Sequence, residues 1–116
     1  MTSVTIPYSV TEIKCEAFSD CRSLTSVTIP NSVTEIGDRA FYDCYSLTSV
    51  TIHNSVTENV DSAFYDCNRL HTIICKPTNP PILGNEAFRG IPSYATIIIP
   101  EGCEKAYMSS DWRRVI

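Results

Sequence analysis

The sequence has a 23-residue period, and this period limits the chain to folds built from stacked, similar units. The segment from Leu24 to Pro30 returns from Leu47 to His53, and its last part opens the chain. A second motif, Ala-Phe followed three residues later by Cys, recurs in step with the first. A unit of this length cannot bury its apolar face alone, so successive units must stack to create a core.

Each repeat contains one short segment with the alternation of a half-buried strand. In Ser-Val-Thr-Ile, Val27 and Ile29 point to one side while Ser26 and Thr28 point to the other, and β-branched residues favour extended backbone. The sequence predicts an α/β solenoid of about five parallel strands spaced by about 4.8 Å, joined by turns, short extended segments and helical or 3₁₀ turns on the convex side. We expect these strands at 3–6, 26–29, 49–52, 72–75 and 96–99.

Residues 21–44 and 44–67 follow, almost position by position, the pattern Cys-x-x-Leu-x-x-(Ile/Val)-x-(Ile/Leu)-Pro-x-x-(Leu/Val)-x-x-Ile-Gly-x-x-Ala-Phe-x-x. This pattern resembles the BspA-type leucine-rich repeat. The resemblance assigns residues 1–70 to repeats, the first of them truncated, and residues 71–116 to a last coil and a C-terminal cap that ends in a helix near Trp112. It implies a bacterial extracellular or cell-surface protein that serves adhesion and protein interaction, with no cofactor and no family-wide catalytic residue.

The repeats depart from this pattern at two places. Asn59 and Val60 replace Ile36 and Gly37, which would bring an amide into the core unless the chain shifts by one residue. We expect the shift, because an unpaired buried amide costs about 1–3 kcal/mol. The second departure follows this coil, where the number of residues between equivalent repeat positions increases by one. Residues 76–81 form a proline-rich crossing at this point, which marks the beginning of the cap.

Charge and hydropathy exclude two classes of partner. Thirteen acidic against nine basic residues give a net charge of −4, and no lysine or arginine cluster is present to meet phosphates, so we expect no nucleic-acid binding. No apolar run approaches about 18 residues, which disfavours a membrane span. The N-terminus has no signal-peptide pattern, and a repeat is already under way at Met1, as in a piece cut from a longer chain.

Three of the six cysteines, Cys21, Cys44 and Cys67, occupy one position of the repeat. Stacked coils would bring neighbouring Cα atoms to about 5 Å, within the range of a disulfide. We favour buried thiols that donate to turn carbonyls, with a disulfide or a metal as the alternatives. No CxxC pair or histidine completes a tetrahedral zinc set. Cys75 takes the inward place of Ile29 and is expected in the core.

Aromatic and acidic side chains also form columns. We expect core packing, in preference to a stacking platform for a ligand, for Phe18, Phe41, Phe64 and Phe88. We expect solvated or turn-capping carboxylates, with Ca²⁺ as the alternative, for Glu12, Glu35 and Glu58, and for Asp20, Asp43 and Asp66. A single file of carboxylates does not surround a Ca²⁺ ion, which takes six to eight oxygens from several directions.

The outward strand residues form the expected concave face, which solenoids use to engage partners. It carries small hydroxyls and becomes apolar toward its C-terminal end. The predicted partner-binding residues are Ser26, Thr28, Ser49, Thr51, His53, Thr72, Ile74, Lys76 and Ile98. A merely solvated sheet is the alternative, because the face lacks the Trp, Tyr or Arg anchors of binding hot spots. A rival contact surface consists of Tyr8, Tyr42, Tyr45 and Tyr65.

Catalysis is not expected, because the two imidazoles, His53 and His71, fall in different columns without a predicted carboxylate partner. The sequence therefore favours a non-catalytic interaction or adhesion module with a protein or cell-surface ligand. A structural spacer or a terminal cap of a longer surface array is the alternative.

The first coil lacks a polar cap before Val4, and we expect a homodimer through its apolar end. The residues of this expected self-association surface are Val4, Ile6, Val10, Ile13 and Phe18. At the other end of the chain, Ala106, Tyr107 and Trp112 are expected to cover the last coil as a lid.

Overall fold

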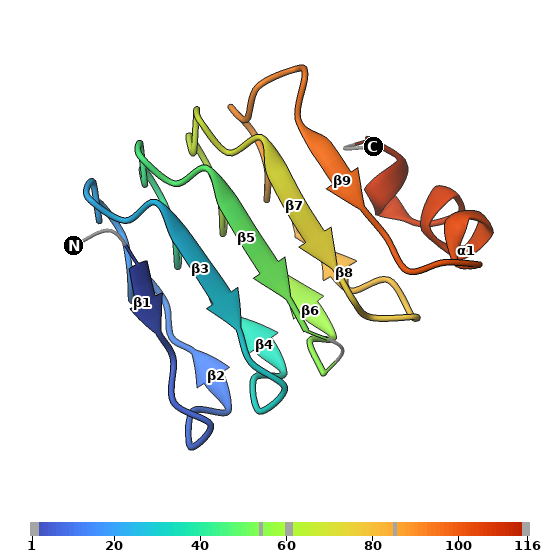
Figure 1. The fold of residues 1–116 in the computed structure, drawn as a ribbon, viewed down its shortest axis with the longest axis horizontal. Coiled ribbons are helices and arrows are strands. Elements are labelled where there is room, and N and C mark those ends of the chain that lie inside the picture. Colours follow the sequence, from blue (N-terminus) through green and yellow to red (C-terminus); the bar gives the residue numbers. More distant parts are fainter. Residues whose placement is uncertain (1–2, 54, 60–61, 85, 115–116) are drawn as a thin grey trace.

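The computed structural model describes residues 3–53, 55–59, 62–84 and 86–114, which form a solenoid of stacked coils (Figure 1). Two parallel sheets form two of its walls. Sheet A contains, in this order, β1 (Ser3–Thr5), β3 (Ser26–Ile29), β5 (Ser49–Ile52), β7 (Thr72–Cys75) and β9 (Thr96–Ile98). Sheet B contains, in this order, β2 (Glu12–Ile13), β4 (Glu35–Ile36), β6 (Glu58–Asn59) and β8 (Ile82–Leu83).

The register of sheet A follows the sequence period. Ser26 pairs with Ser49, and Ser49 with Thr72, so equivalent residues of successive coils lie side by side. The last pairing, Ile73 with Ile97, reflects a spacing one residue longer than that of the earlier pairs. The five predicted strands are confirmed, and the first and last each end one residue earlier than expected.

Sheet B arises from the short extended segment of each coil. Asn59 pairs with Ile36 on one side and with Leu83 on the other, so the backbone keeps its register through β6. The expected one-residue shift is therefore wrong for the strand itself. Val60, which was expected to turn inward, lies outside the described residues.

The convex wall differs from the expected helical or 3₁₀ turns. In the described coils it is a chain of turns in which two positions have left-handed backbone, with φ near 60° at Glu16 and Asp20 in the first coil. The N–H groups of Glu16, Phe18 and Asp20 donate to carbonyls of the next coil, while the residues between them donate within their own coil. Left-handed residues interrupt a right-handed helix, so this alternation replaces it.

The core consists of columns of identical or similar side chains. The rings of Phe18, Phe41, Phe64 and Phe88 stack with neighbouring centroids 5.2, 5.0 and 5.2 Å apart. Phe41, Phe64 and Phe88 are buried, which confirms them as core, and Phe18 packs half-buried against them at the N-terminal end of the column. Leucine, isoleucine and valine columns fill the space between the walls, among them Leu24, Leu47 and Leu70.

A non-repeating segment closes the C-terminal end with α1 (Glu104–Met108) and the 3₁₀ helix η1 (Asp111–Arg114). Trp112 is fully buried and its ring lies 5.3 Å from that of Phe88, so it continues the phenylalanine column. Tyr107 is also fully buried. These two residues form the expected lid, whereas Ala106 is exposed and does not belong to it.

Candidate functional site

The outward face of sheet A, called the sheet A face below, holds the predicted partner-binding residues. Burial alternates along β3, β5 and β7, because the inward residues fill the core while their neighbours reach solvent. None of the nine predicted residues is buried, and parallel pairing aligns them in rows across the coils. Two rows result, both facing outward. The first, which we call the outer row because it lies nearer the strand beginnings, contains Ser26, Ser49, Thr72 and Thr96. The second, which we call the inner row, contains Thr28, Thr51, Ile74 and Ile98.

The inner row changes from hydroxyls to isoleucines between β5 and β7. Ile98 is 47% exposed, and Ile74, its register partner, is half-buried. Neither isoleucine is buried, and residues 77–84 lead into sheet B through β8. The two isoleucines therefore form an exposed apolar step, flanked at the strand ends by His53 and the exposed Lys76.

Two residues of the face were missed at the level of sequence. Thr96 is exposed on β9 and aligned with Thr72. The repeat between them is one residue longer than the others, and this longer spacing could have placed Thr96 in the row of Thr72. Tyr8 was expected only as part of a rival surface on the turns. The structure instead places Tyr8 at the end of the sheet A face.

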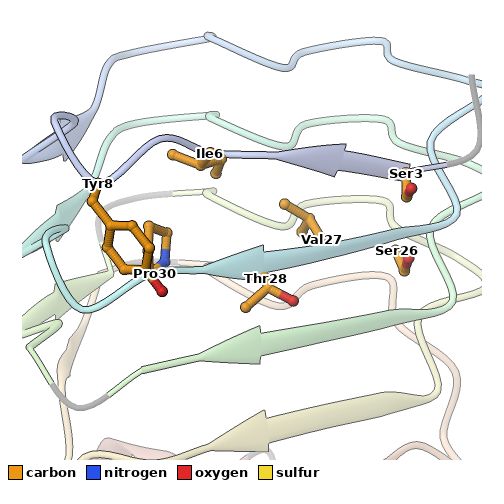
Figure 2. A pocket seen from close by; sticks show the side chains of 7 residues that line it. All are labelled: Ser3, Ile6, Tyr8, Ser26, Val27, Thr28 and Pro30. Carbon is orange, nitrogen blue, oxygen red and sulfur yellow. The ribbon is translucent and has the colours of Figure 1, made fainter.

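A shallow pocket of about 330 Å³ lies on this face over β1 and β3 (Figure 2). Tyr8, 78% exposed, lies beside Pro30 at one end, and Ser3 and Ser26 lie next to each other at the opposite end. Thr28 lies between the two ends, and Ile6 and Val27 complete the lining. The volume is at the lower end of the range for small-ligand sites.

The other tyrosines form a separate, convex surface. The rings of Tyr42 and Tyr65 stack at 5.2 Å, and the guanidinium of Arg39 lies 5.8 Å from the Tyr42 ring. Arg22 lies 5.2 Å above the ring of Tyr45 in the same way. The stack covers one face of each of the rings of Tyr42 and Tyr65, which leaves less aromatic surface open for a ligand.

The aspartate column lies on the same convex wall, and its three members share left-handed backbone. Burial raises the pKa of Asp43, and the nearby carboxylates of Asp66 and Asp20 raise it further. One carboxylate oxygen of Asp43, Oδ1, is buried without a hydrogen-bond partner among the described residues. The column therefore holds closely spaced like charges, with Arg22 as a favourable neighbour.

The cysteine column lines the inside of the same wall. The thiol of Cys44 donates to the carbonyl of Phe18, and that of Cys67 donates to the carbonyl of Phe41, each at 3.1 Å. Hydrogen bonding with Cys44, together with burial, raises the pKa of Cys67, and burial raises the pKa of Cys75 to about 12. All six cysteines are unpaired thiols, and Cys75 is buried in the core as predicted.

The residues expected to mediate self-association are less exposed than the sequence suggested. Ile6 and Ile13 are buried within the chain itself, because the first coil already folds them inward. Val10 and Phe18 are half-buried against the core, and the side chain of Val4 lies outside the described residues. Self-association through this coil stays a prediction, with a smaller apolar surface to carry it.

The two histidines lie in different surroundings. His71 shares a hydrogen bond of 2.9 Å with the Thr72 hydroxyl, and His53 lies half-buried at the edge of the sheet A face. Within the described ranges, no group of three or more His, Cys, Asp or Glu side chains is placed to hold a metal ion. No helix in the described part of the chain is long and apolar enough to cross a membrane.

The comparisons with known proteins agree with this architecture. No curated protein matches the chain. A solved structure, a leucine-rich repeat protein from Bacteroides ovatus ATCC 8483, is similar with a TM-score of 0.69 and 32% sequence identity. The similarity covers 86% of this chain but 30% of that protein, so the chain spans less than a third of its length. The family model of the BspA type leucine-rich repeat region, with six copies, matches residues 1–110. This match, together with the stacked coils and the register of the chain, shows that the chain belongs to the BspA-type leucine-rich repeat family.

Proposed function

We propose that the chain is a non-catalytic interaction module that binds a protein or cell-surface partner through the sheet A face. The observation that carries the proposal is the apolar step at Ile74 and Ile98, which ends a row of hydroxyls and leaves Ile98 47% exposed and Ile74 half-buried. Exposed apolar groups rimmed by polar residues mark interaction sites. The hydroxyls of Thr28 and Thr51 in the same row, and of Thr72 and Thr96 in the neighbouring row, give this contact a polar border.

We further propose an adhesive role at the bacterial cell surface or outside the cell. The leucine-rich repeat family supports a role in protein interaction, and its BspA type is associated with bacterial surface proteins. Repeat solenoids present extended surfaces of this kind to their partners.

A second candidate function is that of a spacer within a longer repeat array. The observation that favours it is the partial coverage of the Bacteroides ovatus protein, in which a similar stretch makes up 30% of a longer leucine-rich repeat chain. A spacer would hold other segments apart and would bind nothing through sheet A.

The test is binding of the purified chain to an array of extracellular-matrix and cell-surface proteins. The variant Ile98→Lys places a charge on the face, and Met108→Lys is its control, because Met108 is 51% exposed but lies on α1. We expect Ile98→Lys to weaken binding at least tenfold and Met108→Lys to leave it unchanged. Equal effects of the two variants would contradict the proposed face, and no binding by the wild-type chain would favour the spacer.

A further inference from the structure

The pocket over β1 and β3 combines two kinds of surface that match one class of ligand. Its hydroxyls come from Ser3, Ser26 and Thr28, and each hydroxyl can both donate and accept a hydrogen bond. Its exposed apolar surface is the ring of Tyr8, which is open to solvent at one end of the pocket beside the buried Pro30 (Figure 2). The pocket can therefore hold a molecule with a CH-rich face and several hydroxyl groups.

The absence of charged side chains from the pocket narrows the class of ligand further. None of its seven lining residues carries a charge, and the chain as a whole has a net charge of −4. An anionic ligand would find no cation here and would be repelled at long range, while a cationic ligand would find no carboxylate. The lining therefore fits a neutral molecule.

The backbone excludes recognition by strand addition within the pocket. Ser3 pairs with Ser26 in parallel register, and the pairing continues to Thr28, so the two strands use their facing backbone groups on each other. A bound peptide could not add its main chain between them. Recognition here falls to side chains, and the only polar ones in the lining are the three hydroxyls and the phenol of Tyr8.

Tyr8 lies in the turn that follows β1, at a position where the second coil has a different residue. The turns that follow β1 and β3 are closed by the same hydrogen bond, from the N–H of Val10 to the Pro7 carbonyl in the first coil and from the N–H of Val33 to the Pro30 carbonyl in the second. The second coil has Asn31 where the first has Tyr8. The large ring is thus an addition to one coil, and 78% of its surface is exposed, so packing of the chain does not require it.

We propose that this pocket binds one or two neutral sugar residues of a glycan, with the CH face of one sugar on the Tyr8 ring and its hydroxyls at Ser3, Ser26 and Thr28. A rigid tyrosine ring supplies contact area at little cost in side-chain entropy. The inference rests on the proposed function, because it assigns a ligand class to one end of the sheet A face, two coils before the isoleucine step begins at Ile74.

The experiment is an array of neutral glycans, with sialylated and sulfated glycans as the charged comparison, probed with the wild-type chain. Tyr8→Ala removes the ring, Tyr8→Phe keeps it, and Tyr94→Ala is the matched control because Tyr94 is 75% exposed on the turn before β9. We expect neutral glycans to bind, with at least a tenfold loss in Tyr8→Ala and no loss in Tyr94→Ala. Tyr8→Phe should retain most of the signal, and Thr28→Val should lose part of it.

Three outcomes would overturn the inference: no neutral glycan binds, only charged glycans bind, or Tyr8→Ala binds like the wild type. Circular dichroism of each variant shows that the fold is intact. The protein-array test with Ile98→Lys is independent of these variants. A protein partner that is sensitive to Ile98→Lys but indifferent to Tyr8→Ala, together with a silent glycan array, would leave the proposed function standing and remove the glycan pocket.

Discussion

The two sides of sheet A are built by different rules. On the inward side, the same or a similar side chain returns in every coil, as with Val27, Val50 and Ile73, and all three are buried. On the outward side, the row that begins with Thr28 changes to isoleucine at Ile74. The inward columns fill a closed volume, in which a change of size at one level affects the levels above and below.

Because of this difference, the inward residues determine the stability of the fold, whereas the outward residues are free to determine recognition. Substitutions at exposed positions usually change the free energy of unfolding by less than about 0.5 kcal/mol, so the outward rows can vary without loss of the fold. The inward columns cannot. Repetition also has a cost on the convex wall, where stacked aspartates carry like charges. Single substitutions can test this contrast, from the largest expected effect to the smallest.

The largest effect is expected from Phe41→Ala. Phe41 is fully buried and its ring stacks on both Phe18 and Phe64, so its loss leaves a cavity in the middle of the column. We expect a loss of about 3–5 kcal/mol in the free energy of unfolding, measured by urea denaturation. A neutral result would show that the inward column is not what holds the coils together.

The segment that closes the C-terminal end of the solenoid allows the packing of the core to be tested beyond the last repeat. The buried hydroxyl of Tyr107 donates to the carbonyl of Pro77 at 2.6 Å, and the indole N–H of Trp112 donates to Pro81 at 2.8 Å. Tyr107→Phe removes one donor and leaves the Pro77 carbonyl without it, for an expected loss of about 1–3 kcal/mol. Thermal unfolding measures the change, and Tyr94→Phe, on an exposed ring, should show none.

The cysteine column should give a smaller effect. Cys44→Ala removes a buried thiol together with its hydrogen bond to the Phe18 carbonyl, and we expect a loss of about 1 kcal/mol. Cys15→Ala is the control, because Cys15 is exposed. Equal stability of the two variants in urea denaturation would mean that the thiol-to-carbonyl bonds do not stabilise the wall.

Asp43→Asn tests the cost of repetition, and we expect it to stabilise the chain. Asparagine tolerates the left-handed backbone of this position and removes a charge from a column whose neighbours are also aspartates, which is worth about 0.2–1 kcal/mol. Because burial and neighbouring charges raise the pKa of Asp43, its neutral form favours folding; the contribution is fully present below the ordinary aspartate pKa and is lost as pH rises through the raised pKa. The advantage of the Asp43→Asn variant over the wild type should therefore grow from pH 3 to pH 7 in denaturation curves, and an advantage that shrinks over this range would contradict the account.

The smallest effect on stability is expected on the outward side. Ile98→Thr restores the hydroxyl found at Thr28 and Thr51, and we expect a change within about 0.5 kcal/mol, because Ile98 lies on the open face. A loss comparable to that of Cys44→Ala in the same denaturation assay would show that the isoleucine step is internal packing.

The sequence predicted the strands of sheet A because each combines period-2 alternation with the 23-residue repeat. The phenylalanine and cysteine columns were predicted for the same reason, since a residue that recurs at one level must meet its copies in the stack. The left-handed backbone of Glu16 and Arg39 was not predictable, because these residues have no special preference for it and the hydrogen bonds between coils enforce it. Nor was the pairing of the short segments into sheet B, which are two residues long and carry no alternation of their own.

The candidate site was predicted only in part. The outward positions of β3, β5 and β7 follow directly from the alternation, and the structure places them on one face. The pocket depends on Tyr8, whose ring lies beside Pro30 of the following coil, and a turn residue carries no periodic signal for the direction of its side chain. The limited exposure of the N-terminal coil was also missed, because Ile6 and Ile13 find core neighbours within the chain.

The most direct test of the central claim, that the sheet A face carries recognition, is isoleucine methyl NMR of the chain with a partner taken from the protein array. Ile74 and Ile98 report on the face, Ile73 reports on the core, and Ile82, 66% exposed on β8, reports on sheet B. We expect the methyl signals of Ile74 and Ile98 to shift on binding while those of Ile73 and Ile82 stay in place. A shift of Ile82 with Ile74 and Ile98 unchanged would contradict recognition through the sheet A face.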